Sequence, residues 1–123
     1  MVDAASPFSD QVRWKSENEF AFSLRDNFPV TKGHTLIVPK RTVSSVFELS
    51  DDEMIACWQL VKREKIALEK ELRPDGFNIG VNDGSVAGQT ISHAHIHLIP
   101  RFKGDHPNPR GGVRAIIPSK ADY

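Results

Sequence analysis

The sequence lacks several features that would place it in a class at once. It has a single cysteine, Cys57, in 123 residues, so no intramolecular disulfide can form. No apolar run approaches the roughly 20 residues that span a bilayer, and no apolar signal segment follows Met1. Together these absences predict a cytoplasmic protein without a membrane partner.

The sequence has no excess of positive or negative charge. Lys plus Arg and Asp plus Glu both total 16, which gives a formal net charge of zero. Without a global positive field, bulk nucleic-acid binding is not expected, and any anionic ligand must be recognised locally. The length suits one core, and no internal repeat is present. We therefore expect residues 1–123 to form a single domain with a single site.

Hydrophobic patterning predicts a mixed fold. Alternating or β-branched apolar residues predict strands over residues 11–15, 19–25, 33–40 and 76–81. A capping box over residues 50–53 begins the one long helix, and Pro74 ends it. An apolar stripe on that helix should pack against the sheet and consists of Ile55, Trp58, Val61, Leu68 and Leu72. Residues 1–6 are expected to be flexible, and residues 102–123 to form an extended tail with little regular structure.

Three of the five histidines, His93, His95 and His97, stand at alternate positions within residues 92–101. Side chains two apart on a strand point to the same face, so the three imidazoles would line one side of a strand. A structural strand buried on both faces would carry apolar residues there instead. The row of titratable rings therefore indicates an active-site strand or a metal-binding strand.

The loop before this strand, residues 82–90, is rich in groups that bind phosphate. Its candidates are backbone N–H groups freed by Gly84 and Gly88, the side-chain amides of Asn82 and Gln89, and the hydroxyl of Thr90. Such groups stabilise charge on phosphoryl oxygens without a cation. Alone, the loop would also fit an ordinary tight turn; beside three aligned histidines it favours phosphoryl chemistry.

Two chemical interpretations of the histidine row follow from the residues. Imidazoles on one face can share a metal ion, but no cysteine lies nearby, and Asp83 and Asp105 flank the row without interleaving with it. In the other interpretation, a neutral imidazole attacks phosphorus and forms a covalent phosphoramidate, while its neighbours orient it and donate to oxygen. The central His95 is then the natural nucleophile, with His93 and His97 as its supports.

The segment His-Ala-His-Ile-His-Leu-Ile, residues 93–99, resembles the signature of the histidine triad (HIT) superfamily, which is His-x-His-x-His followed by two apolar residues. The resemblance extends through Gly-Gln-Thr at residues 88–90 and Asn-Asp-Gly at residues 82–84. Residues 33–39, Gly-His-Thr-Leu-Ile-Val-Pro, are similar to the family's Gly-His-x-Leu-apolar-apolar-Pro strand. From residue 20 to residue 101 the resemblance is continuous.

This resemblance implies an α+β, HIT-like fold: an antiparallel sheet of about five strands with one long helix and short helical segments, continuous across a homodimer. It implies a purine mono- or dinucleotide ligand that is cleaved at the α-phosphate through a nucleotidyl-histidine intermediate. Expected substrates are diadenosine polyphosphates or nucleoside phosphoramidates. The protein should need no cofactor, with Mg²⁺ present only as the companion of a polyphosphate substrate. Some relatives hold zinc through Cys-x-x-Cys near the start, but residues 7–10 contain no cysteine, so no metal site is predicted.

The resemblance also implies roles for individual residues. His95 would take the nucleotidyl group, His97 would contact phosphate or the bridging atom, and His93 and His34 would support the orientation and protonation of the nucleophile. Phosphate contacts would come from Asn82, Gly88, Gln89 and Thr90, the ribose contact from Asp26, and the base contacts from Leu24, Asn27 and Phe8. On the residues alone, Asp26 would be an Asx-turn residue and His34 a buried core histidine. A purine-nucleotide-binding regulatory protein with incidental hydrolysis is the alternative function, because its site would look the same.

Overall fold

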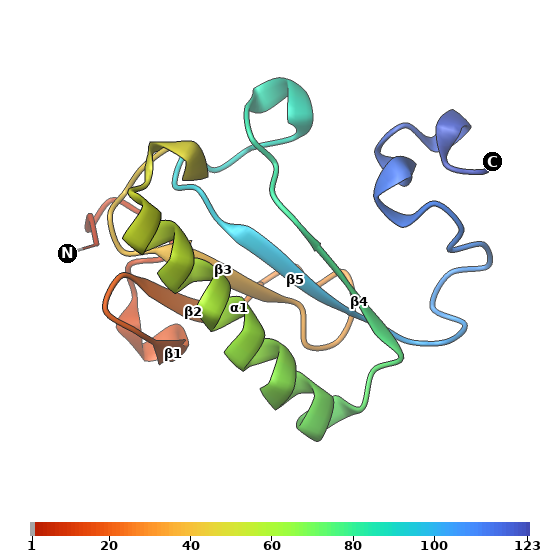
Figure 1. Ribbon diagram of the computed structural model, residues 1–123, viewed down its shortest axis with the longest axis horizontal. Helices are drawn as coiled ribbons and strands as arrows, with labels where there is room; N and C mark the ends of the chain where they lie inside the picture. The colour runs from red at the N-terminus through yellow and green to blue at the C-terminus, as the bar shows by residue number, and fades with distance from the viewer. Residues whose placement is uncertain (1) are drawn as a thin grey trace.

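The computed structural model describes residues 2–123 and has an antiparallel sheet with a long helix packed on one face (Figure 1). Its strands are β1 (Trp14–Glu17), β2 (Ala21–Arg25), β3 (Thr35–Pro39), β4 (Gly76–Gly80) and β5 (Ile96–Arg101). The five strands lie in the order β1-β2-β3-β5-β4, and each neighbouring pair is antiparallel. The expected α+β class and antiparallel sheet are confirmed, and β4 lies at one edge.

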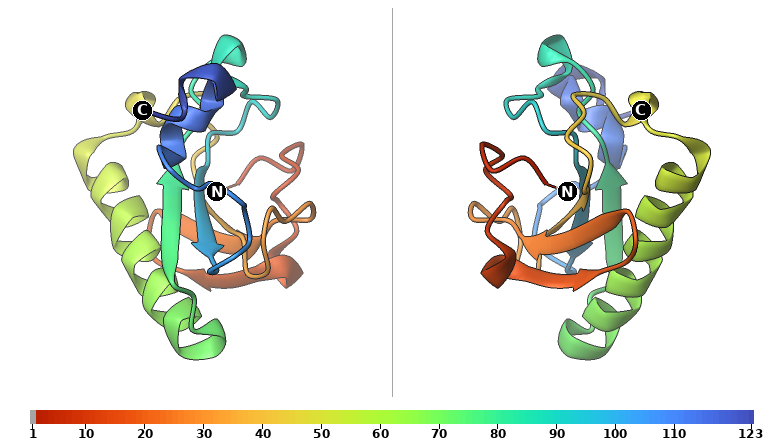
Figure 2. Two further views of the ribbon diagram at one scale, coloured as in Figure 1. Left: turned by 90° about the vertical axis from the view of Figure 1, so that its right-hand side faces the viewer. Right: turned by 90° about the vertical axis from the view of Figure 1, so that its left-hand side faces the viewer.

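The central strands β2 and β3 are buried on both faces because apolar side chains occupy both sets of alternate positions. Toward α1 they contribute Ala21 and Ile37 to one core cluster. Toward the opposite face they contribute a second cluster of Phe22, Leu24, Leu36 and Val38. The two views in Figure 2 show α1 along one face of the sheet, with the N-terminal segment away from it. The second cluster therefore forms the floor on which the functional residues lie.

The helix α1 (Asp51–Leu72) begins and ends where local rules place its boundaries. Ser50 accepts a hydrogen bond from the backbone of Glu53, whose carboxylate in turn accepts one from the Ser50 backbone, so the predicted capping box is present. At the other end Arg73 adopts a left-handed conformation with φ of 51° immediately before Pro74. Since no helix in residues 2–123 is long and apolar enough to cross a bilayer, the structure contains no membrane-spanning helix there.

The predicted apolar stripe of α1 was partly wrong. Val61 and Leu68 are buried against the sheet as expected, but Ile55 and Trp58 are 55% and 48% exposed. The buried face is instead formed by Ala56, Cys57, Leu60, Val61, Glu64 and Leu68. Ile55 and Trp58 belong to a second stripe, because residues three or four apart share a helix face. The two stripes have the same spacing, so spacing alone does not tell which one faces the sheet.

The expected histidine strand over residues 92–101 begins only at Ile96. His93 and His95 lie in the segment that leads into β5, and His97 lies on the strand itself. After β5 the chain continues past the edge of the sheet beyond β4 (Figure 1). This tail contains two short 3-10 helices, Gly112–Ile116 and Pro118–Lys120, so it is more regular than expected.

Ser6 ties the N-terminal segment, expected to be flexible, to the rest of the protein. It is 7% exposed, and its backbone N–H donates to the carbonyl of Asp3. The backbone N–H of Asp3 donates in turn to Thr42 across 39 positions of sequence. Met1, the first residue of the expected flexible stretch, lies outside the described residues. The N-terminal segment therefore packs on the side of the sheet opposite α1 (Figure 2).

Candidate active site

A cavity of about 320 Å³ lies on the side of the sheet that carries the second core cluster, away from α1. Its lining comes from four separate parts of the chain: Pro7, Phe8, Arg13, Asp26, Asn27, Phe28, Leu36, Asn82, Gly88, Gln89, Thr90, Ile91, His95 and His97. The turn after β2, the loop before β5 and the histidines therefore meet in one place, as the sequence predicted. Most of the residues expected to contact a nucleotide lie in this lining.

Hydrogen bonds fix which nitrogen carries the proton on His93 and His95. A carbonyl oxygen only accepts, so His93 Nε2, 2.7 Å from the oxygen of Pro39, and His95 Nδ1, 2.9 Å from the oxygen of His93, are both protonated. The other nitrogen of His93 accepts from the hydroxyl of Ser6 at 2.6 Å. His95 is therefore left with a free lone pair on Nε2, the nitrogen turned away from its backbone contact. That lone pair is what a nucleophile requires.

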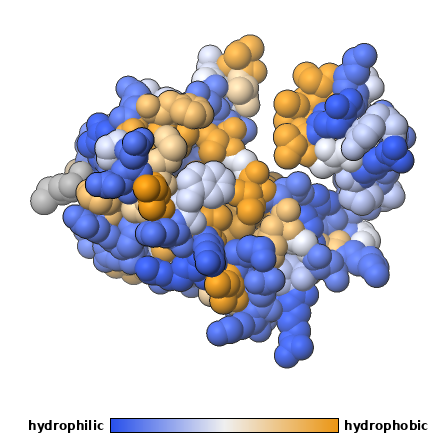
Figure 3. All heavy atoms as spheres, in the orientation of Figure 1, coloured by the Kyte–Doolittle hydropathy of each residue, from blue (hydrophilic) through white to orange (hydrophobic). Residues whose placement is uncertain are grey.

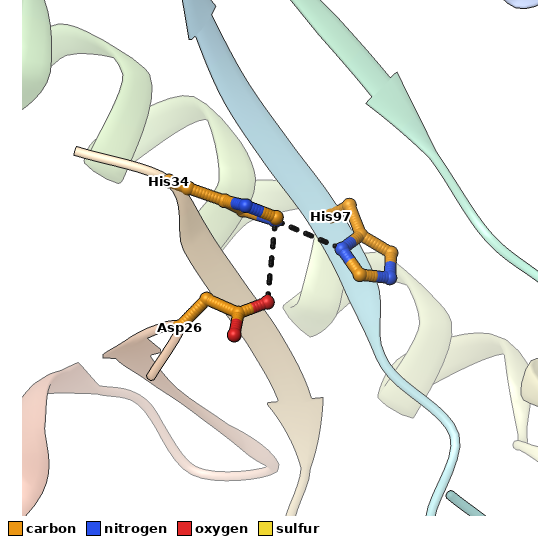
Figure 4. Close-up of side chains that lie close together, drawn as sticks. All are labelled: Asp26, His34 and His97. Atoms are coloured by element: carbon orange, nitrogen blue, oxygen red, sulfur yellow. Dashed lines mark hydrogen bonds and ion pairs between the residues drawn. The ribbon is translucent and has the colours of Figure 1, made fainter. Parts of the chain in front are cut away.

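His34 and His97 form a second pair with defined proton positions (Figure 4). The backbone N–H of Val30 donates to Nδ1 of His34 at 3.0 Å, so the proton of a neutral His34 resides on Nε2. That Nε2–H donates to Nδ1 of His97 at 2.9 Å. A neutral His97 then carries its own proton on Nε2. The pair presents an N–H donor beside the bare nitrogen of His95, whose ring centroid lies 4.9 Å from that of His97.

Burial favours the uncharged form of His34, His93 and His97. Desolvation lowers the pKa of His34, and Asp26 only partly offsets it. Desolvation likewise lowers the pKa of His93, and it lowers that of His97 to about 4 with further contributions from His95 and His34. These three histidines are therefore neutral near pH 7, so each carries one ring proton, as its hydrogen bonds require.

Asp26 forms an Asx turn and also lies beside the histidine pair. Its Oδ1 accepts from the backbone of Phe28 at 2.8 Å, which is the Asx-turn contact expected from the residues alone. Its Oδ2 lies 3.5 Å from Nε2 of His34 (Figure 4). The carboxylate is therefore held at the cavity wall beside the histidine pair, with its remaining acceptor capacity available to a ligand.

The loop over residues 82–90 differs from expectation at Gln89. Both amide hydrogens of Gln89 donate to backbone carbonyls, those of Ser44 and Ile91, and its oxygen accepts from the backbone of Gly84. Gln89 therefore shapes the loop, and the donor expected from its side chain is already occupied. Gly88 adopts φ of 97°, a left-handed conformation that favours glycine, and Asn82 lies against it.

Asp26, His34 and His97 also place three possible metal-ligating atoms within 4.8 Å of one another. Their hydrogen bonds oppose a metal there. Ligation through Nε2 of His34 would need a lone pair on that nitrogen, whereas the bond from Val30 assigns it a proton. A metal would also break the bond between His34 and His97. The cluster is better suited to relaying hydrogen bonds than to holding a cation.

Two expected contacts are placed differently by the fold. Leu24 is fully buried in the second core cluster, and Leu36 from β3 lines the cavity in its place. Phe8 is 4% exposed, and its ring is edge-on to His95 with centroids 5.2 Å apart. His93 is buried behind His95 and outside the cavity lining.

Two residues that build the site, Ser6 and Arg13, could not be identified from the sequence. Ser6 contacts His93 across 87 positions of sequence. Arg13 is the last residue of a short 3-10 turn (Gln11–Arg13) and reaches the cavity from beside β1. A lone serine and a lone arginine carry no periodicity or motif, and only the folded chain brings them to the site.

This combination of fold and site defines a histidine triad protein, and comparison with known families agrees. The HIT domain model matches residues 13–104. The chain belongs to the HIT family. A bis(5'-adenosyl)-triphosphatase from Dictyostelium discoideum is 40% identical over 73% of this chain and 60% of its own length. A bis(5'-nucleosyl)-tetraphosphatase from Schizosaccharomyces pombe is 35% identical over 80% of this chain and 53% of its own length.

A solved structure leads to the same family. A HIT family protein from Bacillus anthracis is 37% identical, with a TM-score of 0.71 over 75% of this chain and 65% of that protein. The chain spans 60% to 63% of the length of several curated relatives that it matches.

Proposed function

We propose that the chain is a nucleotide hydrolase or transferase that cleaves at the α-phosphate through a nucleotidyl-histidine intermediate. The observation that carries this proposal is the pattern of protons: a bare Nε2 on His95 beside an N–H donor on His97, at the wall of one cavity. That pair supplies a nucleophile and a donor to a phosphoryl oxygen. Two relatives with nucleoside polyphosphatase names support the same chemistry.

In the first step, Nε2 of His95 attacks the α-phosphorus, the N–P bond forms, and the bond to the leaving group breaks. A polyphosphate leaves as an anion, whereas an amine leaves with a proton taken from solvent. The imidazole becomes positively charged, and the carbonyl of His93 stabilises its Nδ1–H. His97 donates from Nε2 to a phosphoryl oxygen or to the bridging atom.

In the second step, water attacks the same phosphorus, the N–P bond breaks, and the mononucleotide departs. The water proton passes to solvent, and His95 returns to its neutral form. Asp26 accepts from the ribose hydroxyls, and backbone and side-chain groups of Asn82, Gly88 and Thr90 contact the phosphate. The substrates of this proposal are dinucleoside polyphosphates and nucleoside phosphoramidates, adenosine compounds among them.

Turnover of a substrate panel tests the proposal. At least one diadenosine polyphosphate or nucleoside phosphoramidate should be cleaved with kcat/KM near or above about 10⁴ M⁻¹s⁻¹, within the usual enzyme range. His95→Ala should lower turnover by at least about 10³-fold while mononucleotide binding stays measurable, because only the nucleophile is removed. His106→Ala, at an exposed histidine of the tail, is the matched control. Tight nucleotide binding without efficient turnover would favour the regulatory alternative.

We also propose that the chain acts as a homodimer with a sheet continuous through β4. This strand pairs only with β5 within residues 2–123, and a free strand edge is a template for pairing. A notch of about 790 Å³ separates β4 from the tail, and Figure 3 shows apolar atoms on both its sides. A surface hollow of about 600 Å³ on α1, lined by Met54, Ile55 and Trp58 among others, adds apolar area on the neighbouring face. Two-fold pairing of β4 with its copy would cover these surfaces together.

A further inference from the structure

The polar groups of the 320 Å³ cavity follow the order of the parts of a nucleotide. His95 and His97 lie at the phosphate end. Asp26 comes next, because its carboxylate lies beside His34, the partner of His97. Asn27, the residue after Asp26, and Arg13, which donates to it, line the same cavity, and we assign the base of the proposed nucleotide to them. The end of the cavity that receives the base therefore has a defined pair of polar side chains.

Arg13 is held in place by three oxygen atoms, none of which belongs to a carboxylate. Its Nη2 donates to the carbonyl of Arg25 at 3.2 Å and to Oδ1 of Asn27 at 3.0 Å, and its Nη1 donates to the carbonyl of Pro7 at 3.4 Å. Within residues 2–123 it forms no ion pair. Nε–H and one hydrogen of Nη1 remain as donors on a half-buried guanidinium in the cavity lining.

The contact with Arg13 also fixes the amide of Asn27. An arginine only donates, so the atom that it meets must be the amide oxygen. The amide nitrogen of Asn27 is then turned away from Arg13 and has no acceptor among residues 2–123. Both side chains therefore present hydrogen-bond donors. The carboxylate in the lining, Asp26, contacts Phe28 and His34, and its remaining acceptor capacity is assigned to the ribose in the proposed function.

Two donors side by side distinguish between purines. The Hoogsteen edge of guanine carries two acceptors, O6 and N7, whereas that of adenine carries one acceptor, N7, and the N6 amino donor. Against Arg13 and Asn27, the adenine amino group would leave donors facing each other without a partner, and an unpaired donor is costly when desolvated. Hypoxanthine has the same O6 and N7 acceptors as guanine.

We propose that Arg13 and Asn27 select a 6-oxopurine, guanine or hypoxanthine, over adenine through the Hoogsteen edge of the base. The proposal rests on the nucleotide chemistry proposed above and adds the base that the site prefers. Arg13 acts twice: it donates to the base, and it orients the amide of Asn27.

The test compares three bases in two assays. Dissociation constants for GMP, IMP and AMP should rank GMP and IMP together, each at least about 5-fold tighter than AMP, the lower end of what a bidentate contact gives. The kcat/KM values of guanosine, inosine and adenosine 5'-phosphoramidate should follow the same order. Equal or tighter binding of AMP overturns the proposal, as does IMP binding like AMP, which would mean that the 2-amino group is recognised instead.

The two assays separate this proposal from the proposed function. Selective binding of GMP and IMP without turnover of any phosphoramidate or dinucleoside polyphosphate would refute the catalytic function and leave the base selection standing. Turnover with a preference for adenosine would support the catalytic function and refute the selection of 6-oxopurines. Failure of all three mononucleotides to bind would refute both.

One substitution should invert the preference. Asn27→Asp keeps the acceptor for Arg13 and replaces the free amide donor with a carboxylate oxygen, which accepts from adenine N6. The ratio of GMP to AMP affinity should fall at least about 5-fold. Asn108→Asp, at an exposed tail residue whose side chain also accepts from the backbone, is the matched control for the added charge. An unchanged ratio in Asn27→Asp with an unchanged melting temperature contradicts the proposal.

Discussion

At His95, one hydrogen bond decides which ring nitrogen is available as the proposed nucleophile. The carbonyl of His93 holds the Nδ1 proton and leaves Nε2 bare. The position of that carbonyl depends in turn on His93, which is anchored between Ser6 and Pro39. The His95 imidazole is therefore oriented by backbone and buried side chains and has no neighbouring carboxylate to orient it, in contrast to triads in which an acid does so.

The depressed pKa of His97 predicts a stability that falls in mild acid. Because its pKa is about 4 in the folded protein and near 6.5 in the unfolded chain, the unfolded state binds more protons between these values. The free energy of unfolding should therefore decrease as pH falls from 6.5. Urea denaturation between pH 6.5 and 4.5 measures this slope. Glu53 and Asp105, whose pKa values are lowered to about 2, lose their contributions only at lower pH.

In His97→Gln the free energy of unfolding should depend less steeply on pH between 6.5 and 4.5. One of the groups that gain a proton on unfolding is then gone. His34 and His93 should retain part of the pH dependence, since burial lowers their pKa values too. An identical slope in wild type and variant would mean that His97 is not desolvated in the folded protein.

At the scale of single elements, α1 was predictable where local chemistry sets its boundaries. Ser50 and Pro74 define the two ends through a capping bond and a steric block, and both effects act within one turn of helix. The strands β2 and β3 were predictable because apolar residues alternate along the first and form a β-branched run in the second. The buried face of α1 was not predictable, because two apolar stripes have the same spacing and only packing against the sheet selects between them. His93 left the expected strand because contacts with Ser6 and Pro39 hold it.

The capping box of α1 should contribute measurably to stability. Ser50→Ala removes the acceptor for the backbone of Glu53 and should lower the free energy of unfolding by about 1 kcal/mol. Ser50→Asp restores a capping acceptor and should recover most of that loss. Chemical denaturation at pH 7 gives both values. Equal stability of Ser50→Ala and wild type would show that the helix start is held by other contacts, such as the ion pair of Glu53 with Arg41.

At the scale of the whole molecule, the family and most of the cavity were predictable because the histidine row and the loop before it lie close together in sequence. The remaining lining was not. Ser6 and Arg13 meet the site from segments far from the triad, and the link from Arg13 to Asn27 is formed only when β1 and β2 pair. Residue pattern identifies groups that share an element, whereas contacts between elements follow from the topology.

The proposed dimer predicts that one charge on α1 separates the two copies. Trp58→Glu places a carboxylate in the exposed apolar hollow of the helix and should shift the protein from dimer to monomer at micromolar concentration. Light scattering measures the mass in solution. Val12→Glu is the matched control, because Val12 is 92% exposed beside β1, at the opposite edge of the sheet. A wild-type protein that is monomeric at this concentration would contradict the dimer.

The covalent step is tested most directly by trapping the adduct on the histidine. The best phosphoramidate substrate is mixed with the protein, the reaction is stopped in alkali within the first turnovers, and the intact mass and peptide map are measured. A nucleotidyl-histidine intermediate should appear as one nucleotidyl group per chain, located on His95 and absent in His95→Ala. Turnover without an adduct, an adduct on another residue, or full activity of His95→Ala would contradict it.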